Sequence, residues 1–383
     1  MRLRLKLRQR LAFGIHYLRK AFQRPGLWRV RAEPGLASFS RAALPALLAL
    51  AGLALAWHLI ADTGATAVLH AAASLGWPGF ALVLAAQLLL VVPMGVAWWL
   101  LGRGRPDARL PRFVWARLVR DSAGEALPFS QLGGYAAGAR ALAVAGVSGP
   151  FAAASTVVDV STELAGQLGY TLLGLALLAW RRPGSGLLAP VLLATLAMAA
   201  LVAAFAAVQV RGAGAVDRLL VRASARLPTD EGRAGAPAAA LADAVRTIHA
   251  RRGALLAAIG LHFAEWVLSG VQAWATLRLM GLRPGLSGAL VIDSLLYGAR
   301  SFAFLVPNAI GVQEATLVVV GALFGVPPDA ALGLSLVRRA RDLALAVPAL
   351  CTWQVLEARR AKARSRLRLE HRQRLRPWNA SPE

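Results

Sequence analysis

The chain has 383 residues, of which 57% are hydrophobic, and carries 43 basic against 19 acidic residues, a formal net charge of +24. Apolar runs of about 20 residues exclude an ordinary soluble protein and favour a polytopic helical membrane protein. The basic residues collect in tails and loops beside apolar runs, as in cytoplasmic loops, so we expect no nucleic-acid partner. The single cysteine, Cys351, excludes disulfides and cysteine-based zinc sites.

Residues 1–41 form a basic N-terminal segment. Apolar residues recur there at helical spacing with Arg and Lys opposite, which predicts an amphipathic helix on the anionic inner leaflet. A disordered basic tail is the alternative. The segment is too long and too basic for an ordinary cleaved signal peptide.

Residues 42–210 are predicted to form a first membrane repeat. Its expected spans are 42–61, 76–101, 150–180 and 187–210. The first connection lacks Lys and Arg, whereas arginines follow the second span at once, which places that second connection in the cytoplasm.

Between the second and third spans, residues 113–147 combine charged side chains with glycines and Pro128. Backbone that is not helical exists at membrane depth only when buried in protein or beside water. The segment therefore predicts a re-entrant hairpin that enters from the cytoplasm. An amphipathic loop lying on the surface is the alternative.

Residues 211–252 contain several arginines and helix breakers and are predicted to be a cytoplasmic loop that divides the chain in two. A second repeat follows over residues 253–356, with spans at 253–280 and 328–355 and a second hairpin at 285–326. The basic tail, 357–383, is expected in the cytoplasm with the N-terminus.

One offset of 179 residues relates the two halves and aligns Ser122 with Ser301, Pro128 with Pro307, and Asp159 with Arg338. Charge counting makes the first hairpin enter from the cytoplasm and the second from outside. We therefore predict an all-α polytopic fold of about six transmembrane helices plus two re-entrant broken-helix hairpins, arranged as an inverted repeat.

The two proline-centred hairpins are the predicted substrate-binding site. Proline breaks a helix and exposes N–H groups of the next half-helix, which can meet a phosphate or hydroxyl. The candidate binding residues are Arg120, Glu125, Pro128, Ser130, Gln131, Arg300, Pro307, Asn308, Gln313 and Glu314. The alternative is that these groups bond only to one another and to the backbone.

A second set of charged residues is predicted to join the repeats. Charge at mid-membrane is costly unless it is paired or used. We predict an inter-repeat ion network in which Asp159 and Glu163 pair with the basic residues of the last span. Its members are Asp159, Glu163, Arg338, Arg339, Arg341 and Asp342. A static clamp and a substrate or proton-coupling role both remain open.

Other chemistry has little support in the sequence. There is no phosphate-binding GxxxxGK[ST] loop, no His pair at metal-ligand spacing and no nucleophile elbow, so we expect no catalytic residues, metal or cofactor. His262 and Glu265 lie one turn apart and are interpreted as a buried hydrogen bond rather than a site.

Three motifs carry a resemblance to a known family: Arg120-Asp-Ser-Ala-Gly-Glu-Ala-Leu-Pro-Phe-Ser-Gln-Leu-Gly-Gly134, Arg300-Ser-Phe-Ala-Phe-Leu-Val-Pro-Asn-Ala-Ile-Gly-Val-Gln-Glu314 and Arg338-Arg-Ala-Arg-Asp-Leu343. The chain resembles, over about residues 40–356, the flippase-like membrane region of lysylphosphatidylglycerol synthases, and within it the hopanoid-biosynthesis-associated subfamily. The resemblance implies a bacterial inner-membrane protein connected with lipid translocation. The synthases carry a soluble aminoacyl-transfer domain after the membrane region, whereas here a short basic tail follows it, so we do not expect that activity.

The expected function is thus a lipid transporter or flippase, not driven by ATP on its own, that takes a hopanoid or phospholipid head into a polar groove between the repeats. One alternative is a membrane scaffold that gathers lipid-biosynthesis enzymes through its basic tails. Another is a lipid-modifying membrane enzyme.

Overall fold

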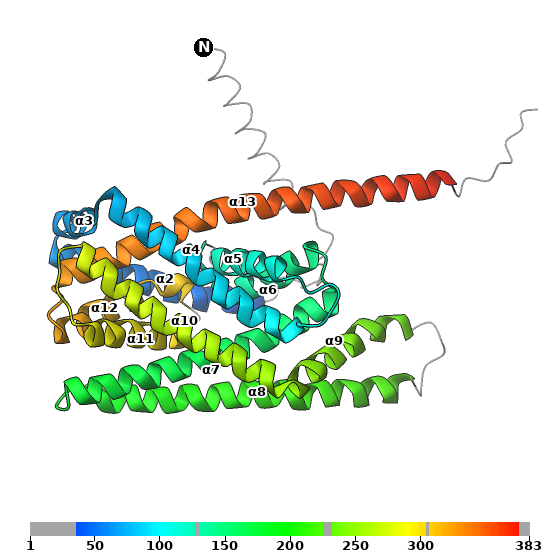
Figure 1. The fold of residues 1–383 in the computed structure, drawn as a ribbon, viewed down its shortest axis with the longest axis horizontal. Helices are drawn as coiled ribbons and strands as arrows, with labels where there is room; N and C mark the ends of the chain where they lie inside the picture. Colours follow the sequence, from blue (N-terminus) through cyan, green and yellow to red (C-terminus); the bar gives the residue numbers. More distant parts are fainter. Residues whose placement is uncertain (1–35, 127–129, 225–231, 304–305, 375–383) are drawn as a thin grey trace, which may run out of the picture. The chain divides into compact units, whose positions relative to one another are not determined.

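The computed structural model describes residues 36–126, 130–224, 232–303 and 306–374, and within these ranges the chain forms helices and no strand (Figure 1). The chain divides into two compact units, Met1–Leu47 and Leu48–Glu383. All the sites discussed below belong to the second unit. The amphipathic helix predicted at the N-terminus lies outside the described residues, apart from the start of α2.

The helices follow one another with short connections: α2 Leu36–Thr63, α3 Ala65–Ala73, α4 Gly76–Gly102, α5 Leu110–Ala126, α6 Ser130–Val144, α7 Gly149–Arg181, α8 Leu188–Ser224, α9 Gly232–Ala250, α10 Arg252–Leu279, α11 Leu286–Phe302, the 3₁₀ turn η1 Pro307–Ala309, α12 Val312–Leu323 and α13 Pro328–Arg374.

Three described helical stretches are long and apolar enough to cross a membrane: α4, residues 188–209 of α8, and α10. Residues Leu47–Thr63 of α2 and α3 together are also long and apolar enough for a fourth span, which would then be bent by 87°. A helix of 28 residues such as α10 is about 40 Å long, against a hydrocarbon core of about 30 Å. α7 and α13 are longer still but carry ionisable residues along their length. The fold is therefore an all-helical membrane fold, and the count of six spans stays a prediction.

The segment 211–252, predicted as a loop, is largely helical. α8 continues to Ser224, and α9 then packs against both α7 and α8. The reason is local: Ala242, Val245 and Ile248 recur at helical spacing and are buried in a hydrophobic core. Arginines flank this apolar stripe, and their number made the whole segment resemble a loop.

The helix order of the first half recurs in the second. α4, α5, α6 and α7 are followed later by α10, α11, α12 and α13. The packing between the halves is reciprocal: α11 lies against α7, α5 lies against α13, and α4 lies against α10. This recurrence supports a duplicated unit. The inversion of the two halves relative to the membrane stays a prediction.

Two hydrophobic cores enclose the ionisable residues. The first is built on Trp98, Phe113 and Leu142, and the second on Leu277, Ile292 and Leu334. α7, α10 and α13 each contribute to both cores. On each of these helices most of the buried polar residues, the ionisable ones included, lie between the segments that enter the two cores. The apolar ends thus hold a polar layer at the middle of the helices.

Candidate polar site between the two helical hairpins

Close packing of α5 on α6 positions the first arginine cluster. A Cβ at Gly138 would lie 2.7 Å from Arg120 Cβ, and one at Gly134 would lie 2.7 Å from the Arg120 carbonyl oxygen. Both glycines are inside α6 rather than at a break. Their role is to let the helices approach, so that Arg120 projects toward α7.

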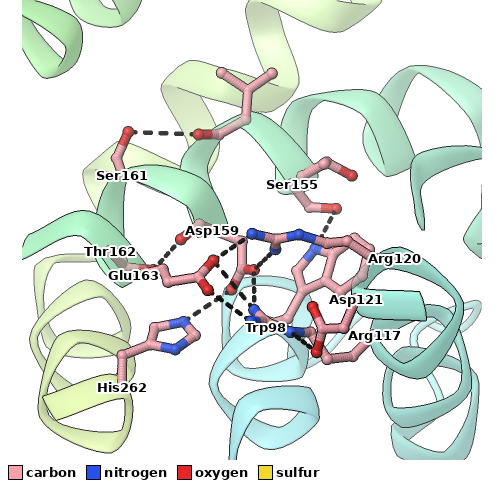
Figure 2. A network of polar contacts seen from close by, with 12 residues as sticks. Trp98, Arg117, Arg120, Asp121, Ser155, Asp159, Ser161, Thr162, Glu163 and His262 are labelled. Carbon is pink, nitrogen blue, oxygen red and sulfur yellow. Dashed lines mark hydrogen bonds and ion pairs between the residues drawn. The ribbon is translucent and has the colours of Figure 1, made fainter. Parts of the chain in front are cut away.

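Arg117 and Arg120 are completely surrounded by protein and hold two carboxylates of α7 (Figure 2). Arg117 donates to both oxygens of Glu163, at 3.2 and 2.6 Å. Arg120 donates to Asp159 Oδ2 at 2.5 Å and also to Glu163. Arg117 bonds in addition to Asp121 at 2.9 Å. We call these five residues, with His262, the arginine network.

His262 joins the arginine network from α10. Its Nε2 lies 3.2 Å from Asp159 Oδ1, on the side of Asp159 that faces away from the arginines (Figure 2). Trp98 and Tyr135 add aromatic contacts to Arg120, with the Tyr135 ring centroid 4.6 Å from the guanidinium carbon. Charge-assisted bonds and ring contacts therefore satisfy these charges internally.

The second helix break has an unusual backbone. Asn308 and Ala309 have φ angles of 51° and 46°, in the left-handed region, and Gly311 has φ 81°. A Cβ at Gly52 would lie 2.3 Å from the Ile310 carbonyl oxygen. The absence of a side chain at Gly52 lets α2 lie directly on the break. This conformation raises the free energy of a non-glycine residue, so it persists only where the surrounding structure holds it in place.

The two broken hairpins meet through polar contacts. Arg300, near the end of α11, donates to Glu125 Oε1 at 2.6 Å and to Gln313 Oε1 at 3.0 Å. Asn308 donates to the Glu125 carbonyl oxygen at 3.1 Å. We call these four residues the hairpin junction. It joins residues more than 170 positions apart, on opposite halves of the chain.

The hairpin junction and the arginine network differ in the exposure of their arginines and not of their acids, since Glu163 and Asp121 of the network are 13% and 34% exposed. The side chains of Arg300 and Glu125 are 12% and 24% exposed, whereas those of Arg117 and Arg120 are 2% and 3% exposed. A ligand could reach the first pair without unpacking the helices. The second pair is sealed.

A chain of hydrogen bonds extends from the junction into α13. Gln313 donates to Ser335 Oγ at 2.7 Å, and Ser335 donates to Glu314 at 2.6 Å. Glu314 also accepts from Arg339 at 2.8 Å and from the Gly311 backbone N–H at 2.7 Å. The carboxylate thus satisfies one of the free N–H groups at the start of α12.

The predicted pairing of Asp159 and Glu163 with the arginines of α13 does not occur. Arg338 pairs instead with Asp293 of α11, which also accepts from the Tyr170 hydroxyl at 3.1 Å. α7 packs mainly on α10, α11 and α9, and α13 mainly on α5, α3 and α12, so α7 and α13 are not close neighbours. The long arginine side chains instead join α5 to α7 and α13 to α11, two helix pairs that are not closely packed either.

The remaining predicted residues have different positions. Arg341 bonds to its neighbour Asp342 and to Gln272 of α10. Pro307 begins η1, and Gln131 is exposed on α6. Pro128 lies outside the described residues, as does the side chain of Ser130.

Several polar residues were not expected at the site. Gln167 donates to Ser301 Oγ at 2.6 Å and to the Tyr297 carbonyl oxygen, which ties α7 to α11. Ser335 bridges Gln313 and Glu314. Asp293, inside a predicted hairpin, was a clear signal, because it is an acid in an apolar stretch. Single Ser and Gln residues give no such signal.

An apolar cavity of about 360 Å³ lies between α7, α8, α11 and α12. Ala299 and Phe302, on either side of Arg300 in the sequence, line it, with Met198 and Val319 across from them. Within the described part of the chain, no group of three or more His, Cys, Asp or Glu residues could hold a metal ion.

Comparison with known proteins gave one match. The sequence model of the family described as "Lysylphosphatidylglycerol synthase TM region" matches residues 43–349. The search of curated proteins gave no match. The search of solved structures gave none either.

Proposed function

Because the chain belongs to the lysylphosphatidylglycerol synthase TM region family, we propose that it is a lipid transporter that moves a lipid head group between leaflets through the hairpin junction. The family links the chain to a membrane and to lipid. The direct movement of a phospholipid or hopanoid, without ATP and without bond-making chemistry, is our proposal.

The observation that carries this proposal is the hairpin junction itself. Two broken helices from opposite halves meet at Arg300 and Glu125, and this pair is partly accessible. Broken helices that converge between repeats are a common way to build a substrate site in transporters. In an accessible ion pair, one residue can release the other and bind a ligand, because the new bond to the ligand replaces the bond that is lost.

The chemistry suits a head group with phosphate or hydroxyls. A phosphate would replace Glu125 as the acceptor for Arg300, since guanidinium groups bind phosphate in a bidentate manner. A polyol would bond to Glu125, Gln313 and Asn308. The apolar cavity beside Ala299 offers room for part of the hydrophobic portion, next to the arginine.

The proposal also includes a membrane arrangement. We propose six spans and two re-entrant hairpins in an inverted repeat, in the bacterial inner membrane, with both termini in the cytoplasm. The exposed leucines of α8, such as Leu193 and Leu201, suit contact with lipid chains. Basic residues of the tails would contact the anionic inner leaflet and, in the scaffold alternative, lipid-biosynthesis enzymes.

Reconstitution into liposomes tests the proposal. The wild-type chain should accelerate the movement of a fluorescent phosphatidylglycerol analogue between leaflets, scored by quenching of the outer leaflet. Arg300→Gln should slow that movement roughly tenfold or more, because a hydrogen bond to a charged group contributes about 1.5–3 kcal/mol. The movement of an analogue with a neutral polyol head should be slowed more by Glu125→Gln than by Arg300→Gln.

The matched control is Arg140→Gln, which removes an arginine from an exposed pair with Glu357 and should leave the rate unchanged. A truncation after Ser365 distinguishes a transporter from a scaffold that acts through its basic tail. A transporter should keep its rate of lipid movement without residues 366–383. Equal rates for wild type and Arg300→Gln would contradict the proposal.

A further inference from the structure

One buried acid has no part in the clusters described above. Glu265 lies at the middle of α10, a helix that is apolar enough to span a membrane. It is 3% exposed, and its Oε2 atom has no hydrogen-bond partner. Taking an isolated carboxylate out of water costs a great deal of free energy, and such a group commonly avoids the cost by binding a proton.

The charged groups that act electrostatically on Glu265 are already paired with one another or with other residues. They are Arg117 and Asp121 on α5, Glu163 on α7 and Asp293 on α11. Arg117 bonds to Asp121 and Glu163, and Arg338 bonds to Asp293. α4, which also packs on α10, has no ionisable residue. Arg341 of α13 bonds to Gln272, two turns further along α10. No arginine in the described part of the chain is bonded to Glu265.

His262 lies one turn away on the same face of α10 and provides a second proton-accepting group. The hydrogen bond expected between His262 and Glu265 is not formed, because His262 Nε2 bonds to Asp159 and both His262 Nδ1 and Glu265 Oε2 lack a partner. The Nε2 atom of His262 faces Asp159, whose carboxylate oxygens can only accept, so Nε2 carries the hydrogen. Nδ1 is then a free base, and it is buried without a partner. Two unpartnered proton acceptors therefore lie side by side along the helix where the two halves meet.

We propose that Glu265 is a proton-binding site through which a proton gradient drives the lipid movement proposed above. When the site is open to one side of the membrane, the neutral carboxyl group gives its proton to water and becomes a carboxylate. When the site is open to the other side, the carboxylate takes a proton from water and is neutral again. His262 Nδ1 accepts and returns the proton along the way. The inference rests on the proposed function, and supplies its energy source.

The first experiment observes the proton itself, on the full chain reconstituted in lipid. Infrared difference spectra between acidic and alkaline pH should contain the carbonyl band of a protonated carboxyl group in a dry site. Glu265→Gln should remove that band, and Glu265→Asp should shift its midpoint pH. Asp243→Asn, at an exposed acid on α9, should keep it. A band that persists unchanged in Glu265→Gln overturns the inference.

The second experiment measures lipid movement in liposomes with and without an imposed pH gradient, again with the phosphatidylglycerol analogue. The gradient should accelerate the wild type several-fold. Glu265→Gln imitates the neutral carboxyl, so it should keep gradient-independent movement and lose the acceleration.

The outcomes separate the two proposals. Movement that ignores the pH gradient, that responds equally in Glu265→Gln, or that responds to a sodium gradient instead overturns proton coupling and leaves the transporter in place. An absence of movement in every sample, wild type included, overturns the proposed function and the coupling with it. His262→Gln should reduce the response to the gradient without removing the infrared band of Glu265.

Discussion

At the residue scale, the arginine network shows how charge is kept inside a membrane protein. Arg117 and Arg120 both bond to Glu163. Arg117 also bonds to Asp121, and Arg120 also bonds to Asp159. Every charge in this group has an opposite charge within bonding distance. The two arginines of the group are buried and paired internally, in contrast to the partly accessible pair at Arg300.

Glu163→Gln should therefore destabilise the fold. The substitution leaves two buried guanidinium groups short of a counter-charge, and breaking a buried pair in this way costs about 3–5 kcal/mol. The midpoint of detergent-induced unfolding measures the loss. Glu357→Gln removes a carboxylate from an exposed pair with Arg140 and should cost at most about 1 kcal/mol. Similar losses of stability for the two variants would refute the description of the arginine network as buried and internally paired.

The sequence identifies the acids of this network but not their partners. Asp159 and Glu163 are conspicuous because acids are rare in an apolar helix. Their pairing depends on which arginine the fold brings near. The offset between the repeats suggested Arg338, and α5 instead supplies Arg117 and Arg120.

At the element scale, glycine has two distinct uses in the hairpins. Gly311 takes a positive φ at the second break, where a helix must start again after a turn. Gly134 and Gly138 lie within α6 and permit contact with α5. A glycine-rich pattern therefore did not mean irregular backbone throughout the first hairpin.

Gly138→Ala tests this helix contact. The new Cβ would lie 2.7 Å from Arg120 Cβ, so either α6 or Arg120 must shift, at a cost of about 1–3 kcal/mol. Thermal unfolding in detergent measures the effect. Gly133→Ala is the matched control on the same helix: its Cβ would meet nothing within 4 Å, and alanine should stabilise the helix by roughly 0.5–1 kcal/mol. A neutral Gly138→Ala would contradict the close contact.

At the scale of the whole molecule, helices of each half pack against helices of the other half. Each half lays its first hairpin helix, α5 or α11, against the last helix of the other half, α13 or α7. This crossing brings Glu125, at the end of α5, to Arg300, near the end of α11. The site thus exists only when both halves are folded.

Cysteine labelling tests the proposed orientation. In a Cys351→Ser background, a cysteine at Gly186 should react from outside the cell with a membrane-impermeant maleimide. A cysteine at Arg109 should react only after the membrane is permeabilised. Both positions are exposed in connections between helices. Labelling of both from the same side would exclude the proposed topology.

The sequence by itself determined the membrane class and the helical content. Apolar runs, charge placement and helix breakers act locally, so a linear pattern records them. The tertiary structure decided which charges meet: Arg120 with Asp159, Arg338 with Asp293, and Arg300 with Glu125. It also left the Oε2 atom of Glu265 without a hydrogen-bond partner. Pairing between distant residues follows from how helices cross and how closely glycines let them approach, and neither property is written in the spacing of residues along one helix.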